Sequence, residues 1–164
     1  MKTIKKYSES IIFGLLFIVT IVLNILNCIN ETLLLSIIGS LATIYFGILK
    51  LKIENDLLFK ELFNSFNDRY DTRFNDLINE LKINTDKQIK GKKRNIVIDY
   101  FNLCAEEYLW YSKKRIPNNV WKAWKSGILE NLEISQIKEI YEQETLTSRG
   151  KTSYYGLYEE LKKK

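Results

Sequence analysis

Three carboxylates lie close together in the sequence and are the side chains best suited to catalysis. Asp99, Glu106 and Glu107 fall on one expected helix, where a carboxylate can act as a general acid or base. The chain has no histidine, which removes the commonest general base and the Ser-His-Asp and Cys-His arrangements. No glycine-rich phosphate loop, metal-binding motif or nucleophile elbow accompanies the carboxylates. Charged positions on an amphipathic helix usually form its solvated face, so we expect a protein that is not an enzyme and has no cofactor or metal.

A second pattern places basic residues among aromatic ones, which is typical of nucleotide-binding surfaces. Lys and Arg neutralise phosphates, while Trp and Tyr rings can stack on bases. The candidate nucleotide-binding residues form three clusters: Lys87, Lys90, Lys92, Lys93 and Arg94; Lys113, Lys114 and Arg115; and Arg149 and Lys151. The aromatic residues that accompany them are Trp110, Tyr111, Trp121 and Trp124. Aromatic residues at helical spacing more often belong to a core, and in that alternative the lysines are solvated or contact anionic lipid.

Two uncharged, apolar stretches precede nearly all the charged residues. Residues 11–29 and 32–49 are each long enough to cross the hydrocarbon core of a bilayer, about 30 Å thick, as a helix. Only two residues connect them, so the sequence predicts a tight transmembrane hairpin over residues 1–50 and a helical regulatory domain over residues 51–164. The first stretch could instead be a signal peptide, but no small-residue cleavage site follows it and a second apolar stretch comes at once.

The basic residues that flank the hairpin indicate its orientation. They precede the first stretch and follow the second, whereas the connecting loop has none; they are Lys2, Lys5, Lys6, Lys50 and Lys52. Cytoplasmic flanks of membrane spans are enriched in Lys and Arg. We therefore expect both termini in the cytoplasm. The net charge of +5 also makes a polyanion or an anionic membrane surface a reasonable partner.

Polar and small residues within the two stretches give two possible packing faces. Thr20, Asn24 and Asn27 share one face of the first helix, and polar groups in hydrocarbon are costly without a partner or water. The second helix carries a ridge of small residues, Gly39, Thr43 and Gly47, which permits close helix contact. In one interpretation both faces pack the hairpin against itself. In the other, several hairpins assemble and the polar face lines a central water path.

The remaining sequence predicts an all-α domain, since the alternating apolar pattern of strands is scarce. Apolar residues at helical spacing predict one long helix over residues 51–81, continuous with the second span. Shorter helices are expected at 96–114, 120–132 and 134–144, and a last turn or two at 154–161. Asn118 or Asn119 is the expected cap of the third helix, and residues 148–151 are expected to form a loop.

Three aromatic-rich segments resemble a known bacterial family. They are residues 66–70 (FNDRY), 99–108 (DYFNLCAEEY) and 120–124 (VWKAW). Together with the two short spans, they are similar to the phage abortive infection membrane proteins, which include small two-span effectors of antiphage systems. Among named types, the channel effector of the Hailong system is the closest match. Membrane effectors of cyclic-oligonucleotide-gated CRISPR systems and of retrons share the same layout.

The resemblance implies an antiviral defence protein of the bacterial inner membrane that permeabilises this membrane in an infected cell. Effectors of this kind respond to a nucleotide or nucleic acid, and one type is restrained by a DNA oligomer made by a partner nucleotidyltransferase. Our expectation is therefore a homo-oligomeric ion channel or pore in the lipid bilayer, gated by a nucleotide or short single-stranded oligonucleotide. The alternative is a membrane-anchored binding module, without a channel, that senses nucleotide or recruits a partner protein.

Overall fold

The computed structural model describes residues 2–70, 72–83 and 88–163, with side chains from residue 8 onward. Every regular element in these ranges is a helix, which confirms the predicted all-α class. The chain divides into two compact units, Met1–Leu57 and Leu58–Lys164. Each unit is described separately below.

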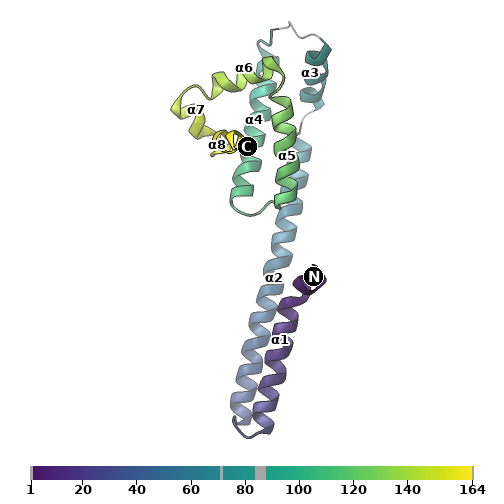
Figure 1. Cartoon of the computed structure of the whole chain (residues 1–164), viewed down its shortest axis with the longest axis vertical. Helices are drawn as coiled ribbons and strands as arrows, with labels where there is room; N and C mark the ends of the chain where they lie inside the picture. The colour runs from purple at the N-terminus through teal and green to yellow at the C-terminus, as the bar shows by residue number, and fades with distance from the viewer. Residues whose placement is uncertain (1, 71, 84–87, 164) are drawn as a thin grey trace. The chain divides into compact units, whose positions relative to one another are not determined.

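The first unit is a hairpin of two antiparallel helices (Figure 1). It consists of α1 (Lys2–Ile25) and the part of α2 (Glu31–Arg69) that ends at Leu57. The ring of Phe13 lies 5.2 Å from that of Tyr45, centroid to centroid, and the hydroxyls of Ser10 and Tyr45 are 3.0 Å apart. An ion pair of 2.5 Å joins Glu9 to Lys52. These contacts fix the pairing of the two helices near the open end of the hairpin.

The turn between the two helices is built by asparagines. Asn27 adopts a left-handed conformation with φ 56°, which Asn tolerates better than most residues. Its amide donates to the carbonyl of Asn24, and the amide of Cys28 donates to the carbonyl of Leu23. This pair of bonds is a Schellman motif and ends α1 at Ile25, so the last four residues of the predicted span 11–29 lie in the turn. Cys28 is exposed there.

Between residues 11 and 49, the surface of the hairpin is mainly apolar. Both helices are long and apolar enough to cross a membrane, by length and composition, and almost none of their apolar residues is buried within the chain. Leu35 and Phe46, for example, are largely exposed. Apolar surface in water costs about 25 cal/mol per Å². Two long, exposed apolar helices at the N-terminus are therefore compatible with membrane anchoring.

The second unit packs around α4 (Lys92–Ser112), which contacts α3, α5, α6 and α8. Val97, Phe101, Cys104 and Ala105 of α4 are almost completely buried, because they share the face on which these helices pack. The surrounding helices are α3 (Thr72–Ile83), α5 (Asn118–Asn131), α6 (Ser135–Glu144), α7 (Ser148–Ser153) and α8 (Leu157–Lys162).

The predicted continuous helix over residues 51–81 is wrong. Helix α2 ends at Arg69 and α3 begins at Thr72. The sequence between them has neither Gly nor Pro, the residues that most strongly disfavour a helix. The chain instead turns so that α3 buries one apolar face in the core; the residues of that face are Phe74, Leu77, Ile78 and Leu81.

Two local predictions in the C-terminal part are also wrong. The expected loop at 148–151 is helix α7, whose N-cap Thr147 accepts a hydrogen bond of 3.0 Å from the amide of Gly150. Helix α5 has Pro117 rather than Asn118 or Asn119 at its N-cap position. Proline fits there because its fixed φ, here −61°, is compatible with the entry to a helix.

Candidate anion-binding site

The predicted pore-lining residues have hydrogen-bond partners within the hairpin. Thr20 is buried, and its hydroxyl donates to the carbonyl of Leu16 at 2.8 Å. The Asn24 amide donates to the carbonyl of Ile29 at 3.1 Å, and Asn27 forms the left-handed cap of α1. Packing and turn formation thus account for all three residues without a pore. Their role as pore lining stays a prediction.

The small-residue ridge of α2 is open in the hairpin. Gly39, Thr43 and Gly47 are exposed, and a Cβ added at either glycine would meet no atom within 4 Å. The Thr43 hydroxyl donates to the carbonyl of Gly39 at 2.8 Å, which satisfies its O–H donor inside its own helix. Helix α1 therefore does not occupy this ridge.

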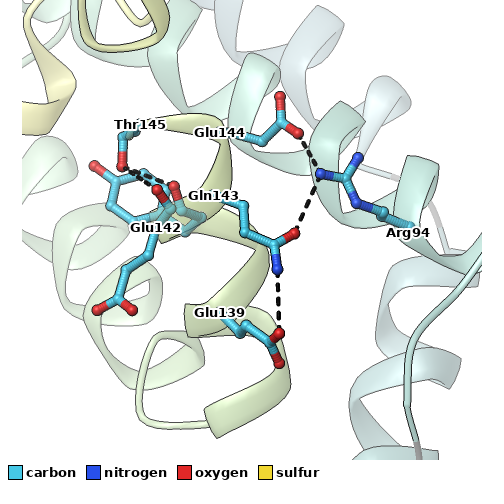
Figure 2. A network of polar contacts seen from close by, with 7 residues as sticks. Arg94, Glu139, Glu142, Gln143, Glu144 and Thr145 are labelled. Atoms are coloured by element: carbon cyan, nitrogen blue, oxygen red, sulfur yellow. Dashed lines mark hydrogen bonds and ion pairs between the residues drawn. The ribbon is translucent and has the colours of Figure 1, made fainter. Parts of the chain in front are cut away.

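Two cations of the first basic cluster are paired with carboxylates. Lys93 binds Glu80 of α3. Arg94 donates to Glu144 at 2.6 Å and to Gln143 at 3.5 Å, both in the last turn of α6 (Figure 2). Gln143 in turn donates to Glu139 at 3.1 Å, so the network continues along α6. These two side chains link α4 to α3 and α6. Because each is already paired with a carboxylate, we expect each to bind a phosphate more weakly than an unpaired cation would.

The other members of that cluster lie at the surface or outside the described residues. Lys90 and Lys92 are exposed just before and at the start of α4. Lys87 lies outside the residues that the structure describes. The cluster thus brings together fewer available ammonium groups than the sequence indicates.

One lysine of the second cluster lies against an aromatic ring. The Lys113 ammonium lies 4.9 Å from the Trp110 ring centroid, a cation–π contact. Lys114 and Arg115 are exposed, and Lys114 has a left-handed backbone with φ 59°. Of the aromatic residues singled out nearby, Trp121 is buried in the core.

A groove with a lysine rim contains one residue of the third cluster. It has a volume of about 490 Å³, within the range of small-molecule sites. Its basic residues are Lys138 of α6, Lys151 of α7 and Lys162 of α8, and its floor is formed mainly by apolar side chains: Leu129, Leu132, Leu146, Tyr158 and Leu161. We call this feature the lysine groove. Arg149, the other member of the third cluster, is exposed and does not line it.

Tyr158 lies at the centre of the positive charge. The ammonium of Lys162 is 4.0 Å from its ring centroid and that of Lys151 is 4.9 Å away. Lys162 first, and then Lys151, lower the pKa of the Tyr158 hydroxyl, because nearby cations favour its anionic form. Glu142 is the one acidic residue that lines the groove, and it pairs with Lys138 at 3.8 Å. The groove therefore offers an apolar floor and a net positive rim, which suits an anion with an apolar or aromatic part.

Sequence reasoning identified Lys151 but missed Lys138, Tyr158 and Lys162. Tyr158 and Lys162 are four residues apart and share one helical face, which is a local signal. Lys138 has no such signal, since it reaches the groove from α6, and only the packing of α6 beside α7 and α8 brings it there.

The three carboxylates considered for catalysis do not converge. Asp99 and Glu106 line a pocket of about 530 Å³, but Glu106 accepts two hydrogen bonds from Arg69, at 2.5 and 2.9 Å. The Arg69 guanidinium lowers the pKa of Glu106. Glu107 is buried and lines a different pocket, and burial raises its pKa to about 8. Among the described residues, no group of three His, Cys, Asp or Glu side chains is arranged to hold a metal ion.

Comparison of the chain with protein-family models, with curated proteins and with solved structures finds no match.

Proposed function

We propose that the chain is a membrane-embedded, homo-oligomeric channel or pore whose helical unit binds a phosphate-bearing regulator. The two apolar helices would cross the bilayer, and the Leu58–Lys164 unit would lie in the cytoplasm. On this proposal the protein is an antiphage effector of the abortive infection type, which agrees with the resemblance of its aromatic segments. Binding changes the conductance only if the regulator prefers one state of the oligomer.

The open ridge of α2 carries the proposal. One hairpin cannot enclose a pore, so a channel needs contacts between copies. A ridge of small residues is the type of surface along which helices approach closely in lipid. Gly39 and Gly47 present this surface outside the hairpin, where it is available to a second copy.

Filling the ridge is expected to prevent assembly. In the Gly39→Leu, Gly47→Leu double variant, side chains would occupy the space that the backbone of a second copy needs. We expect dye efflux from liposomes to fall by about tenfold and the oligomer to dissociate in native mass spectrometry. Gly14→Leu is the matched control, because Gly14 is also an exposed glycine of the hairpin with open space at its Cβ but lies on α1. Equal efflux and equal assembly for all three proteins would rule out this contact.

The lysine groove is the proposed site of the regulator. A nucleotide places an aromatic base beside phosphates, and the groove places Tyr158 and leucines beside Lys151 and Lys162. Phosphate contacts with Lys supply affinity that falls with salt, whereas stacking depends much less on salt. The proposal therefore assigns the phosphates to the rim and the base to the floor.

Charge reversal in the groove is expected to weaken nucleotide binding. We expect the Lys151→Glu, Lys162→Glu double variant to bind a short fluorescein-labelled single-stranded DNA at least about tenfold more weakly, with a shallower salt dependence. Fluorescence anisotropy measures both quantities. Lys82→Glu, Lys122→Glu is the control, since these two lysines are exposed and do not line the groove. If Lys90→Glu, Lys92→Glu weakens binding more than the groove variant, the site belongs to the α4 terminus instead.

The lysine groove alone also supports a second candidate, a membrane-anchored module that binds a ligand without conducting. Liposome efflux separates the two candidates. A chain that binds the labelled DNA, with an intact groove, yet never releases dye in either the free or the bound state would be the binding module.

A further inference from the structure

A small pocket in the Leu58–Lys164 unit combines aromatic rings with one buried carboxyl group. It has a volume of about 260 Å³ and lies among the C-terminal end of α2, α4 and α5. Four aromatic residues line it, namely Phe66, Tyr70, Tyr100 and Trp124. Glu107, only 9% exposed, lines it as well. We call this feature the aromatic pocket.

The helical repeat brings these groups together. Tyr100, Cys104 and Glu107 are spaced i, i+4 and i+7 on α4, so they share one face. On α5, Trp124 lies one turn before Gly127, whose missing side chain leaves the space beside it open. The rings are held by their neighbours: Trp124 is 5.9 Å from Phe66 in an edge-to-face contact, and the Tyr100 hydroxyl accepts a hydrogen bond of 2.9 Å from Asn131.

Among the residues that the structure describes, no cation forms an ion pair with the carboxyl group of Glu107. The charge of Arg69 lowers the pKa of Glu107, but both terminal nitrogens of Arg69 donate to Glu106. A buried carboxylate without a partner is costly, and the effect of burial outweighs that of Arg69 on the pKa of Glu107. A cation in the aromatic pocket would supply the missing charge.

We propose that the aromatic pocket binds a small organic cation with a quaternary ammonium group, with Glu107 as its counter-ion and the rings of Tyr70 and Trp124 against its methyl groups. A quaternary ammonium ion is weakly hydrated, bulky and without N–H donors, so aromatic faces solvate it well. This inference does not depend on the proposed channel.

A metal ion fits the aromatic pocket less well. Magnesium and calcium require several oxygen ligands, and zinc prefers thiolates and imidazoles in tetrahedral geometry. The aromatic pocket offers one carboxylate, the side-chain amides of Asn67 and Asn131, and the Cys104 thiol, whose pKa burial raises well above its usual value; its lining includes no second carboxylate and no imidazole. The aromatic ring faces would contribute no ligand to a metal ion, whereas they attract an ammonium group.

Binding should become tighter as the pH rises through about 8. A quaternary ammonium has no proton to lose, so only the protein titrates in this range. Five ionisable groups surround Glu107. Helix α2 contributes Arg69 and Tyr70 near its end, and α4 contributes Tyr100, Cys104 and Glu106. The residues of α5 that line the pocket do not ionise. Burial raises the pKa of Tyr70, Tyr100 and Cys104, and Arg69 and Glu106 stay charged. Glu107, with a pKa of about 8, is therefore the group that changes charge.

Choline binding to the full-length chain in detergent micelles, measured by isothermal titration calorimetry, tests the proposal. We expect Glu107→Gln to weaken binding at least about tenfold and to abolish its pH dependence, because the isosteric amide removes only the charge. Trp124→Leu should weaken binding about fivefold through the loss of a cation–π face. Glu130→Gln is the matched control: this carboxylate is exposed on α5, does not line the aromatic pocket, and its loss should leave choline binding unchanged.

The neutral isostere 3,3-dimethyl-1-butanol separates charge from shape. We expect it to bind at least about tenfold more weakly than choline to the parent chain and equally weakly to Glu107→Gln. Choline titrations in phosphatidylcholine and in phosphatidylglycerol nanodiscs distinguish the source of the ligand. If the phosphatidylcholine headgroup occupies the pocket, it competes with choline, and apparent choline binding is weaker in phosphatidylcholine. Equal binding in both nanodiscs identifies a free ammonium compound as the ligand. The proposal fails if choline does not bind, if the alcohol binds as tightly as choline, or if Glu107→Gln and Trp124→Leu both bind choline normally.

Discussion

Raising the pH from about 4.5 to about 8 is expected to destabilise the Leu58–Lys164 unit by about 1.4 kcal/mol per pH unit, up to several kcal/mol in total. The cause is Glu107, whose pKa burial raises from 4.5 to about 8. In this range the unfolded carboxyl is ionised while the folded one keeps its proton, so the folded state binds more protons. The contribution of Glu107 to the free energy of unfolding is therefore complete below pH 4.5. It is lost as the pH rises from there through about 8, and it changes little at higher pH.

Urea unfolding at a series of pH values measures this effect. All three tryptophans lie in the Leu58–Lys164 unit, so intrinsic fluorescence reports its unfolding even in the full-length chain in micelles. Glu107→Gln should unfold with a nearly pH-independent midpoint and be more stable than the parent above pH 8. Glu130→Gln, which removes an exposed carboxylate, should show the same dependence of the urea midpoint on pH as the parent. If the urea midpoint of Glu107→Gln depends on pH as strongly as that of the parent, another group titrates in this range.

Gly150→Ala is expected to lower the free energy of unfolding of the same unit by about 2–3 kcal/mol. A Cβ at position 150 would lie 2.0 Å from the backbone carbonyl oxygen of Glu144, far inside van der Waals contact. A backbone atom cannot rotate away as a side chain can, so α7 must shift from the end of α6, and overpacking of this kind typically costs 1–3 kcal/mol.

Gly127→Ala provides the contrast for Gly150→Ala. Gly127 lies within α5, and a Cβ there would meet no atom within 4 Å. Alanine favours the helix by about 0.8–1 kcal/mol over glycine, so this variant should be slightly more stable than the parent. The two substitutions add the same methyl group, and their opposite signs would isolate the steric contact with Glu144. A Gly150→Ala variant as stable as Gly127→Ala would mean that α7 does not pack against α6 in this way.

The helices around the core were predictable because their signal is local. The segments expected at 96–114, 120–132 and 134–144 correspond to α4, α5 and α6 within a few residues. Apolar residues recur along each of them at helical spacing, and those residues are the ones buried. The all-α class follows from the same periodicity.

Neither the end of α2 nor the ion-pair partners of the basic residues were predictable, because residues far away in the sequence determine both. Arg69 is held by Glu106, which lies 37 positions further on, and Arg94 by Glu144, 50 positions further on. No spacing in the sequence indicates such partners. The lysine groove is the reverse case: Lys151 was identified, but Lys138 and Lys162 join it only through the packing of three short helices.

The two cysteines differ sharply in accessibility, since Cys104 is 2% exposed whereas Cys28 is exposed in the turn between α1 and α2. A bulky, water-soluble maleimide should therefore react with one sulfur atom in the native chain. The protein thus contains a single natural attachment point, at the tip of its hairpin. In sealed vesicles, the side from which that reagent must be added would read out the topology without any engineered residue.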